Sequence, residues 1–342
     1  MISAAKITLA HGAGGRETEE LIKNIIIPTF LYRNIEGGIG LDDLEDSAVI
    51  PISSEEYLAV TMDSYTVNPI FFPGGDIGKL AACGTINDLA VVGAKPMGML
   101  DGIVVEEGFN LDDLKKILRS LESVLRELRI PLLGGDFKVM PKGSIDNIVI
   151  TTCGIGIIKG SPIRDSGARP GDKVIVSGTI GDHGAVILAL QSGLEIESEE
   201  LLSDCQPVLP IMEEALKIGG IHAAKDPTRG GIAMALNEIA KKSNVMIAID
   251  EKRIPIRDSV RAYCDMLGVD PLSLACEGRV VMCVDPKVAD DVVEALHSIG
   301  QEDARIIGEV YEEPKGYVVM KTIIGGTRIV EAPSGEIVPR IC

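Results

Sequence analysis

Four aspartates stand where predicted strands end, helices turn or loops begin: Asp46, Asp63, Asp88 and Asp226. Magnesium takes hard oxygen ligands, so carboxylates that converge beside a phosphate loop would hold a metal and nucleotide together. For any single aspartate, a helix cap or a closed turn is the better explanation. The stretch DPTRGG, residues 226–231, favours the chemical interpretation, because it combines a metal ligand, an arginine for anions and glycine amides before a helix.

A second glycine-rich stretch precedes another predicted helix and would expose backbone amides at the positive helix end, with a lysine beside them: Gly74, Gly75, Gly78 and Lys79. It is not a Walker motif, since Pro73 stands where glycine is required and Leu80 where serine or threonine is required. The stretch is therefore either a phosphate loop or a tight turn before a helix.

Cys342 is the last residue of the sequence and follows a short segment, PSGEIVPRI, with few packing demands. The seven cysteines are odd in number and include no C-x-x-C pair, which indicates neither a disulfide framework nor a zinc site. Most are expected to be small buried side chains, an interpretation that does not fit Cys342. We therefore expect its thiol to carry chemistry.

Three further features leave their roles open. His183 in GDHGA and Glu277 in ACEGR lie in glycine turns, where each is either a site residue or a structural one. The stretch HGAGGRE at residues 11–17 is similar to an esterase oxyanion loop, but the chain has no G-x-S-x-G elbow for a serine nucleophile. No G-x-G-x-x-G motif follows a strand, so a Rossmann dinucleotide site is not indicated.

The elements that must position these residues alternate between short apolar strands and amphipathic helices. The clearest helix spans 111–129, where Asn110 can cap and leucines form one apolar stripe. In the second half, helices are expected near 182–191, 207–218, 230–242, 258–267 and 287–299, with strands between them. The irregular stretch 161–172 predicts a boundary between two α/β units whose sheets need helices over one face.

Composition limits the class of protein. With 342 residues the chain exceeds one ordinary core, and with 46% hydrophobic and 3% aromatic residues its cores are expected to be aliphatic. A formal net charge of -18 argues against nucleic acid and anionic membranes as partners. No export signal and no long apolar run are found, which predicts a cytoplasmic protein.

Taken together, these stretches resemble one known family. HGAGGRE, PGGDIGKLAACGTINDLA, GDHGA, DPTRGG, ACEG and the terminal VPRIC occur in the order found in the HypE family, the carbamoyl dehydratases of nickel-iron hydrogenase maturation. This family is related to aminoimidazole ribonucleotide synthetase and selenophosphate synthetase, and the PRIC ending separates it from those relatives. The resemblance covers the length of the chain.

For the fold, the resemblance implies an α/β (α+β) protein with two domains of the aminoimidazole-ribonucleotide-synthetase type. Residues 1–160 would form an N-terminal domain that binds ATP and shares its sheet with a partner in a homodimer. Residues 161–330 would form a C-terminal α/β domain, and residues 331–342 a mobile tail that carries Cys342.

For the site, the resemblance implies ATP and Mg²⁺ in the cleft between the domains. The metal ligands carried over are Asp63, Asp88, Asp226 and Asp46. At the position of Asp46 the identity of the ligand remains open, with Asp42 and Asp43 as the alternatives. The reason is that Glu45 and Asp46 stand where relatives often have adjacent aspartates. The nucleotide contacts carried over are Gly74, Gly75, Gly78, Lys79, Asn87, Thr228, Arg229 and Gly230.

The implied reaction is the ATP-dependent dehydration of a carbamoyl group on Cys342 to a thiocyanate, which supplies cyanide for the iron of the hydrogenase. Glu277 together with Lys138 would supply the base, with His11 a weaker candidate. The implied partners are the carbamoyltransferase HypF and the HypC–HypD iron-loading complex. Two alternatives remain: a selenophosphate or purine-type synthetase, which has no use for a terminal cysteine, and a non-catalytic scaffold switched by ATP.

Overall fold

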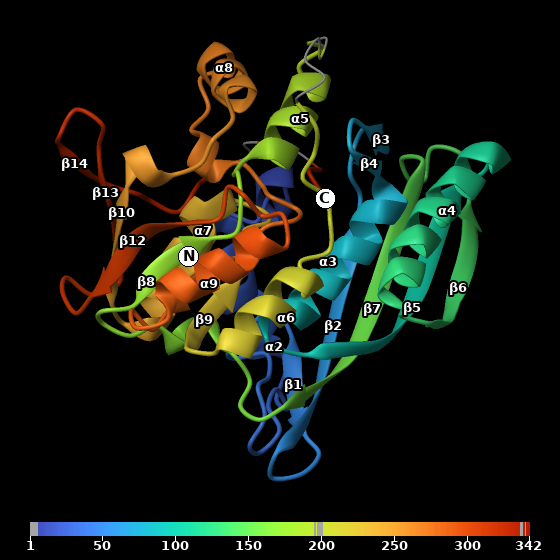
Figure 1. Ribbon diagram of the computed structural model, residues 1–342. Coiled ribbons are helices and arrows are strands. Elements are labelled where there is room, and N and C mark those ends of the chain that lie inside the picture. The colour runs from blue at the N-terminus through green and yellow to red at the C-terminus, as the bar shows by residue number, and fades with distance from the viewer. Residues whose placement is uncertain (1–5, 195, 197–200, 336–337, 339) are drawn as a thin grey trace.

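The computed structural model describes residues 6–194, 196, 201–335, 338 and 340–342, and its strands form two large sheets with helices packed on them (Figure 1). Within this described part, no helix is both long enough and apolar enough to cross a membrane. The last β-strand of the first sheet ends at Lys159 and the first of the second sheet begins at Lys173.

The first half forms a five-stranded sheet in the order β1-β2-β7-β5-β6. Neighbouring strands are antiparallel except β5 and β6, which are parallel because a helix returns the chain between them. A two-residue hairpin, β3 with β4, stands apart from this sheet. The strands are β1 (Ala48–Pro51), β2 (Glu56–Tyr65), β3 (Phe71–Phe72), β4 (Gly75–Asp76), β5 (Lys95–Glu106), β6 (Leu132–Met140) and β7 (Ile148–Lys159).

Two helices, α3 (Ile77–Val91) and α4 (Leu111–Leu128), cover one face of this sheet (Figure 1). The prediction of α4 is confirmed, with the Asn110 side chain accepting from the backbone N–H groups of Asp112 and Asp113 at 2.7 and 3.2 Å. Helix α3 is buried on nearly all sides, since it also contacts α6 and β9 of the second half. The side of α3 that contacts α6 and β9 therefore lies between the two halves.

The second half forms a seven-stranded sheet in the order β14-β13-β10-β12-β8-β11-β9, antiparallel except for β10 and β13. Its predicted helices and strands are all found. The strands are β8 (Lys173–Val176), β9 (Ile221–Lys225), β10 (Met246–Asp250), β11 (Val281–Val284), β12 (Arg305–Tyr311), β13 (Tyr317–Lys321) and β14 (Thr327–Ile329). The helices are α5 (Asp182–Gln191), α6 (Leu209–Ile218), α7 (Gly231–Ser243), α8 (Asp258–Leu267) and α9 (Ala289–Ser298).

Helices cover both faces of this second sheet, whereas the sequence predicted one covered face. Along β8, Val174 and Val176 belong to the hydrophobic cluster of α7, while Ile175 between them belongs to the cluster of α6 and α9. Successive side chains of a strand point to opposite faces, so each face buries its own apolar set. Because both faces are apolar, the strands lack the alternation that would have indicated one solvent-facing side.

A segment before β1 lies against the second half and consists of short helices: η1 (Leu9–Gly12), α1 (Arg16–Leu21), η2 (Ile22–Ile26) and α2 (Ile27–Thr29). Three further short helices lie in the second half and its entry: η3 (Asp165–Gly167), η4 (Glu251–Arg253) and η5 (Pro271–Ser273). One hydrophobic cluster includes α3, α6 and the tail residues Val338 and Ile341. The chain ends between the two halves (Figure 1).

Candidate active site

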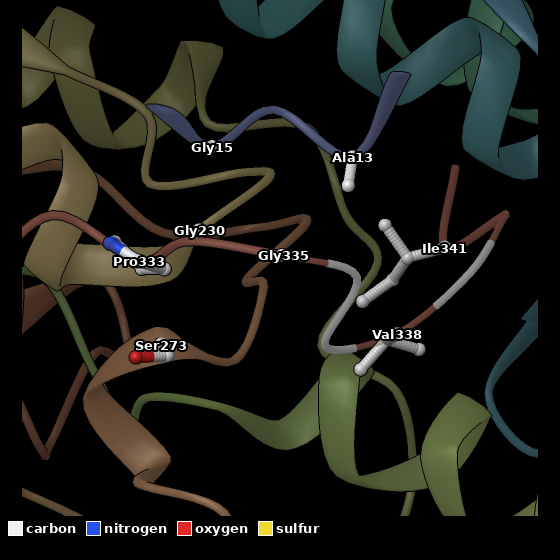
Figure 2. A pocket seen from close by; sticks show the side chains of 8 residues that line it. All are labelled: Ala13, Gly15, Gly230, Ser273, Pro333, Gly335, Val338 and Ile341. Atoms are coloured by element: carbon white, nitrogen blue, oxygen red, sulfur yellow. The ribbon is translucent and has the colours of Figure 1, made fainter. Parts of the chain in front are cut away.

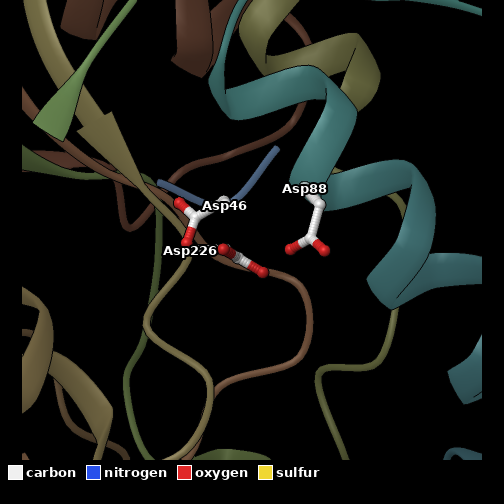
Figure 3. A group of neighbouring side chains, drawn as sticks. All are labelled: Asp46, Asp88 and Asp226. Carbon is white, nitrogen blue, oxygen red and sulfur yellow. The ribbon is translucent and has the colours of Figure 1, made fainter. Parts of the chain in front are cut away.

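Three of the four predicted aspartates converge between the halves. One oxygen from each of Asp46, Asp88 and Asp226 lies within 4.8 Å of the others, and Figure 3 shows the carboxylates turned toward one another. They come from the segment before β1, from α3 and from the end of β9. Asp63 on β2 joins the group through a contact with the Asp88 carboxyl. The two sheets and the helix between them therefore build one acidic centre.

Repulsion and burial act on this centre together. Burial, followed by the charges of neighbouring aspartates, raises the pKa of Asp88 well above its usual range and that of Asp226 to about 8. Thr61 donates to Asp88 at 2.7 Å, but Asp226 Oδ2 has no hydrogen-bond partner among the described residues. A buried oxygen without a partner is costly. An all-oxygen donor set with one unpaired buried atom fits Mg²⁺.

Lys225 supplies part of the compensating positive charge. Its ammonium group bonds Asp46 and lies 3.3 Å from Glu238 and 3.7 Å from Asp165. These carboxylates raise the pKa of the lysine well above its usual value despite its burial, so it stays charged. The sequence interpretation missed Lys225, although it directly precedes DPTRGG.

A pocket of about 500 Å³ opens beside the acids and is bordered by the start of α7. Gly230 and Gly231 both have positive φ, and a Cβ at Gly231 would lie 2.4 Å from the Leu274 carbonyl oxygen. Only glycine fits there without a shift of the backbone. No side chain caps this helix start, and Thr228 and Arg229 line the same pocket. The α7 start can therefore bind an anion held by a metal at the acids.

Cys342 lies at the inner end of this region. A small cavity is lined by Cys342, Glu277 and Arg229 together with Asp63, Asp88 and Asp226. Val338 and Ile341 of the tail are buried. Figure 2 shows them lining a small pocket that Gly230 and Ser273 also line. The described end of the tail thus packs into the core, whereas the sequence suggested that it adds little there.

Two titratable groups face each other in this cavity. Burial raises the pKa of the Cys342 thiol to about 12, while the Arg229 guanidinium acts in the opposite direction. Burial, with Cys205 and Asp226 adding to it, raises the pKa of Glu277 well above its usual value. Glu277 Oε1 has no hydrogen-bond partner among the described residues, and its backbone N–H donates to Asp204 at 3.1 Å. The Glu277 backbone is therefore anchored by Asp204, and Oε1 is available to bond a group on Cys342.

The 74–79 loop is placed elsewhere. Asp76 accepts from the amides of Gly78 and Lys79 at 2.8 and 3.0 Å, and Lys79 Nζ donates to the Gly74 carbonyl at 2.9 Å. These groups bond within the loop, and the loop lines none of the pockets described above. Its predicted phosphate contact thus has no support within one chain.

Other predicted residues also lie apart from the acidic centre or serve the structure. Asn87 is buried and bonds the backbone of Gln206, Val208 and Glu277. Lys138 is exposed on β6 and bonds Asp136. Lys138 does not line the cavity that holds Glu277 and Cys342.

The structure also places Asp42, Asp43 and His11, whose roles the sequence left open. Asp42 pairs with Arg33 at 2.9 Å and Asp43 bonds Arg164, whereas Asp46 belongs to the acidic group. His11 Nδ1 accepts from the Thr8 backbone N–H at the start of η1. His183, by contrast, contacts the tail, although its sequence context indicated no specific role.

Comparison with known proteins defines the class first. Residues 44–158 match the model of the AIR synthase related protein N-terminal domain, and residues 169–321 match that of its C-terminal domain. The acidic centre between the halves is thus set in an AIR-synthase-related fold.

Individual relatives narrow this class. A putative hydrogenase expression/formation protein of Methanocaldococcus jannaschii is 48% identical over 98% of this chain and 100% of its own length. The carbamoyl dehydratase HypE of Cupriavidus necator is 40% identical over 100% of this chain and 96% of its own length. The chain belongs to the HypE family of carbamoyl dehydratases.

Solved structures agree with this assignment. In a crystal structure of a HypE–HypF complex, the matched chain has a TM-score of 0.84 and 40% identity, covering 92% of this chain and 99% of that chain. A HypE structure in complex with ATP has a TM-score of 0.81 and 37% identity, covering 98% and 100%.

Proposed function

We propose that this protein is an ATP-dependent carbamoyl dehydratase that converts an S-carbamoyl group on its own Cys342 to a thiocyanate. The observation that carries the proposal is the placement of Cys342 in one cavity with Glu277, Arg229 and three of the acids. A free small substrate would not require a thiol of the chain at this point. Similarity to a HypE structure in complex with ATP supports the same cosubstrate here.

The proposed reaction removes the oxygen of the carbamoyl group as phosphate. The carbamoyl oxygen attacks the γ-phosphorus of ATP, the bond to ADP breaks, one N–H proton is lost, and the product is an iminophosphate on the cysteine sulfur. Loss of the remaining N–H proton and cleavage of the C–O bond then give the nitrile and phosphate. The net change is S-carbamoylcysteine plus ATP to S-cyanocysteine, ADP, phosphate and a proton.

The residues divide this work. Asp46, Asp63, Asp88 and Asp226 would hold Mg²⁺, which when bound neutralises charge on the transferred phosphoryl group. Thr228 and Arg229 border the pocket and, with Gly230 next to them in the chain, would orient the phosphates at the α7 start. In the metal-free chain, burial raises the pKa of Glu277 well above its usual value, so base action is favoured as pH rises and the carboxyl group loses its proton beside Arg229. The role of Lys138 as part of the base together with Glu277 stays a prediction.

The state of the Cys342 thiol favours loading outside the cleft. A thiolate is the nucleophile that accepts a carbamoyl group, and burial in the docked position raises the thiol pKa to about 12. The docked position of the tail therefore favours the modified Cys342. A second position outside the cleft favours the unmodified thiol. This argues for the mobile tail expected of residues 331–342, and for loading by HypF, with which a relative was solved in complex.

A homodimer is proposed through the first sheet. Its face away from α3 and α4 carries Val60 and Met62 of β2 opposite Ile155 and Cys153 of β7. Met62 is 67% exposed, and Leu100 of β5 faces the same side. Apolar sheet faces are normally covered. We further propose cytoplasmic action and delivery of the cyano group to the HypC–HypD complex, both on family resemblance.

Mass spectrometry of the C-terminal peptide tests the reaction. The full-length protein is incubated with HypF, carbamoyl phosphate and ATP, and the same mixture without ATP is the control. The carbamoylated peptide should lose one water only when ATP is present. A tail that becomes carbamoylated but keeps its mass with ATP would overturn the dehydratase proposal in favour of the ATP-switched scaffold. The variant Cys342→Ala should give neither product.

A further inference from the structure

The backbone of the tail is bound from both halves of the protein. The carbonyl of Arg340 accepts from Asn68 N at 3.1 Å, and that of Cys342 accepts from Thr66 N at 2.9 Å, both in the first half. The Ile341 carbonyl between them accepts from His183 in the second half, at 2.8 Å from Nε2. The last residues of the tail therefore bridge the cleft through main-chain atoms.

His183 is built to donate this hydrogen bond. It lies in the first turn of α5, is fully buried, and has a pKa that burial lowers, so the ring is neutral and carries one N–H. A carbonyl only accepts, so the proton is on Nε2 and Nδ1 is an acceptor. Nδ1 accepts from Ser203 Oγ at 2.8 Å, and Ser203 Oγ in turn accepts from Cys205 N at 3.1 Å. Ser203 thus stabilises the tautomer that the tail requires.

The ring is also held in orientation. Phe72 contacts it edge to face, with ring centroids 5.2 Å apart and planes at 79°. The residue that accepts its bond, Ile341, has a buried side chain and directly precedes Cys342. A bond to this carbonyl therefore limits where the sulfur can lie.

We infer that His183 is a positioning residue that holds the tail in the cleft by donating to the Ile341 carbonyl, and so places the Cys342 sulfur beside Glu277 and Arg229. Tail docking follows from the geometry alone, whereas the consequence for catalysis rests on the proposed function. When His183 loses its donor, the Ile341 carbonyl stays buried without this partner, and the undocked tail gains population.

Two substitutions separate the bond from the packing. His183→Phe keeps a ring against Phe72 but removes the donor, and His183→Gln keeps an amide N–H near the position of Nε2. In the full-length, unmodified protein, the rate of Cys342 alkylation by iodoacetamide is followed on the C-terminal peptide by mass spectrometry. His183→Phe should react about tenfold faster than the wild type, the factor that one net hydrogen bond contributes. His183→Gln should restore most of the protection.

Further measurements exclude a general loss of structure. The two variants should unfold at similar temperatures, and the buried Cys276 should stay unreactive in both. Ser203→Ala, which leaves the imidazole in place, should increase Cys342 alkylation by a smaller factor. In turnover, His183→Phe should lower kcat with the KM for ATP unchanged, and His183→Gln should recover it.

Each outcome decides the inference. Wild-type alkylation of Cys342 in folded His183→Phe would overturn it, as would equal increases in His183→Phe and His183→Gln. If His183→Phe fails to fold, Ser203→Ala decides, because wild-type alkylation there contradicts a tautomer-dependent bond. A protein that shows these alkylation rates but no ATP-dependent loss of water would disprove the proposed function and leave the docking role standing.

Discussion

The starts of α3 and α7 look alike in sequence and differ in what occupies them. Both follow glycine-rich stretches, PGGDIGK and DPTRGG, and both were predicted to bind phosphate. At α3 the Asp76 side chain accepts from two backbone amides and also bonds Ser120. At α7 no side chain caps the helix, and the acids, Arg229 and the tail surround it.

The difference shows that exposed glycine amides are not enough for an anion site. An aspartate at the cap position already supplies the negative charge that the helix start favours, so the α3 start has a permanent occupant. The α7 start instead adjoins a pocket and the tail, and no side chain of its own N-cap occupies it. Its occupant can exchange, and exchange is what a site for nucleotide and tethered substrate requires.

The largest expected effect is at Glu277, beside the α7 start. Glu277→Gln should lower kcat by about 10²- to 10⁴-fold with little change in the KM for ATP, because general-base help is of this size. Burial raises the pKa of Glu277, so the wild-type kcat should increase with pH as the base form appears, and the variant should lose that increase. The matched control is Lys79→Ala at the α3 start, where about a twofold change is expected. Similar losses in both variants would contradict the contrast between the two helix starts.

Asp226→Asn should have the next largest effect. It should lower the activity and raise the stability of the metal-free protein. Turnover should fall about 10²-fold, because metal stabilisation of charge contributes several kcal/mol. The metal-free variant should melt at a higher temperature than the wild type, since burial and Asp46 raise the pKa of Asp226 to about 8 and asparagine carries no charge. This gain should increase as pH rises from the ordinary aspartate range toward 8, where the wild type must ionise a buried acid.

Calorimetry with and without Mg²⁺–ATP checks this second prediction. Added Mg²⁺–ATP should raise the melting temperature of the wild type more than that of Asp226→Asn. A metal-free variant that melts below the wild type would show that Asp226 is an ordinary structural residue.

Local sequence signals predicted much of the fold and the acids of the site. The leucine spacing and Asn110 define α4 without tertiary information, and the second-half helices follow from their own periodicity. Asp226 stood out because its neighbours in DPTRGG form the α7 start. What local signals could not supply is the partner of each group. Asp76 was treated as part of a phosphate loop although aspartate is a common N-cap.

Contacts between distant segments were beyond local patterns. Thr66 and His183 bond the tail from positions 276 and 158 residues away in the chain. Lys225 compensates charge on Asp46, which precedes it by 179 residues. Such pairs depend on how the two sheets pack on α3, and no spacing in the sequence encodes that packing. For the same reason the buried surroundings of Cys342 could not be predicted.

The docking of the tail at the α7 start should depend on pH, whereas the bonding of the Asp76 side chain at the α3 start should not. Burial raises the pKa of the docked Cys342 thiol to about 12, above the 9.0 of an ordinary thiol. Docking of the free thiol is therefore fully favourable below pH 9 and weakens as pH rises from 9 toward 12, by at most about tenfold per pH unit. Hydrogen exchange at the Thr66 amide, which donates to the Cys342 carbonyl, measures the docked fraction. Cys342→Ser removes the thiol and is the control.

Two results would limit this third prediction. If Cys342→Ser showed the same pH dependence of the Thr66 amide, once corrected for intrinsic exchange, another group would control docking. If the Thr66 amide of the wild type showed no such change between pH 8 and 10, the tail would be as permanent an occupant as Asp76.

The smallest effect is expected at the α3 start itself. Asp76→Ala removes the acceptor of the Gly78 and Lys79 amides and should lower the free energy of unfolding by about 1 kcal/mol, the usual contribution of a helix cap. Asp76→Asn, which keeps a capping oxygen, should cost less. Neither variant should change the KM for ATP, because the acids and the open α7 start lie elsewhere. Denaturant unfolding and ATP kinetics on the same samples measure both quantities. A tenfold increase in the KM for ATP in folded Asp76→Ala would mean that the 74–79 loop binds phosphate after all, and the two helix starts would then differ in their occupants but not in their function.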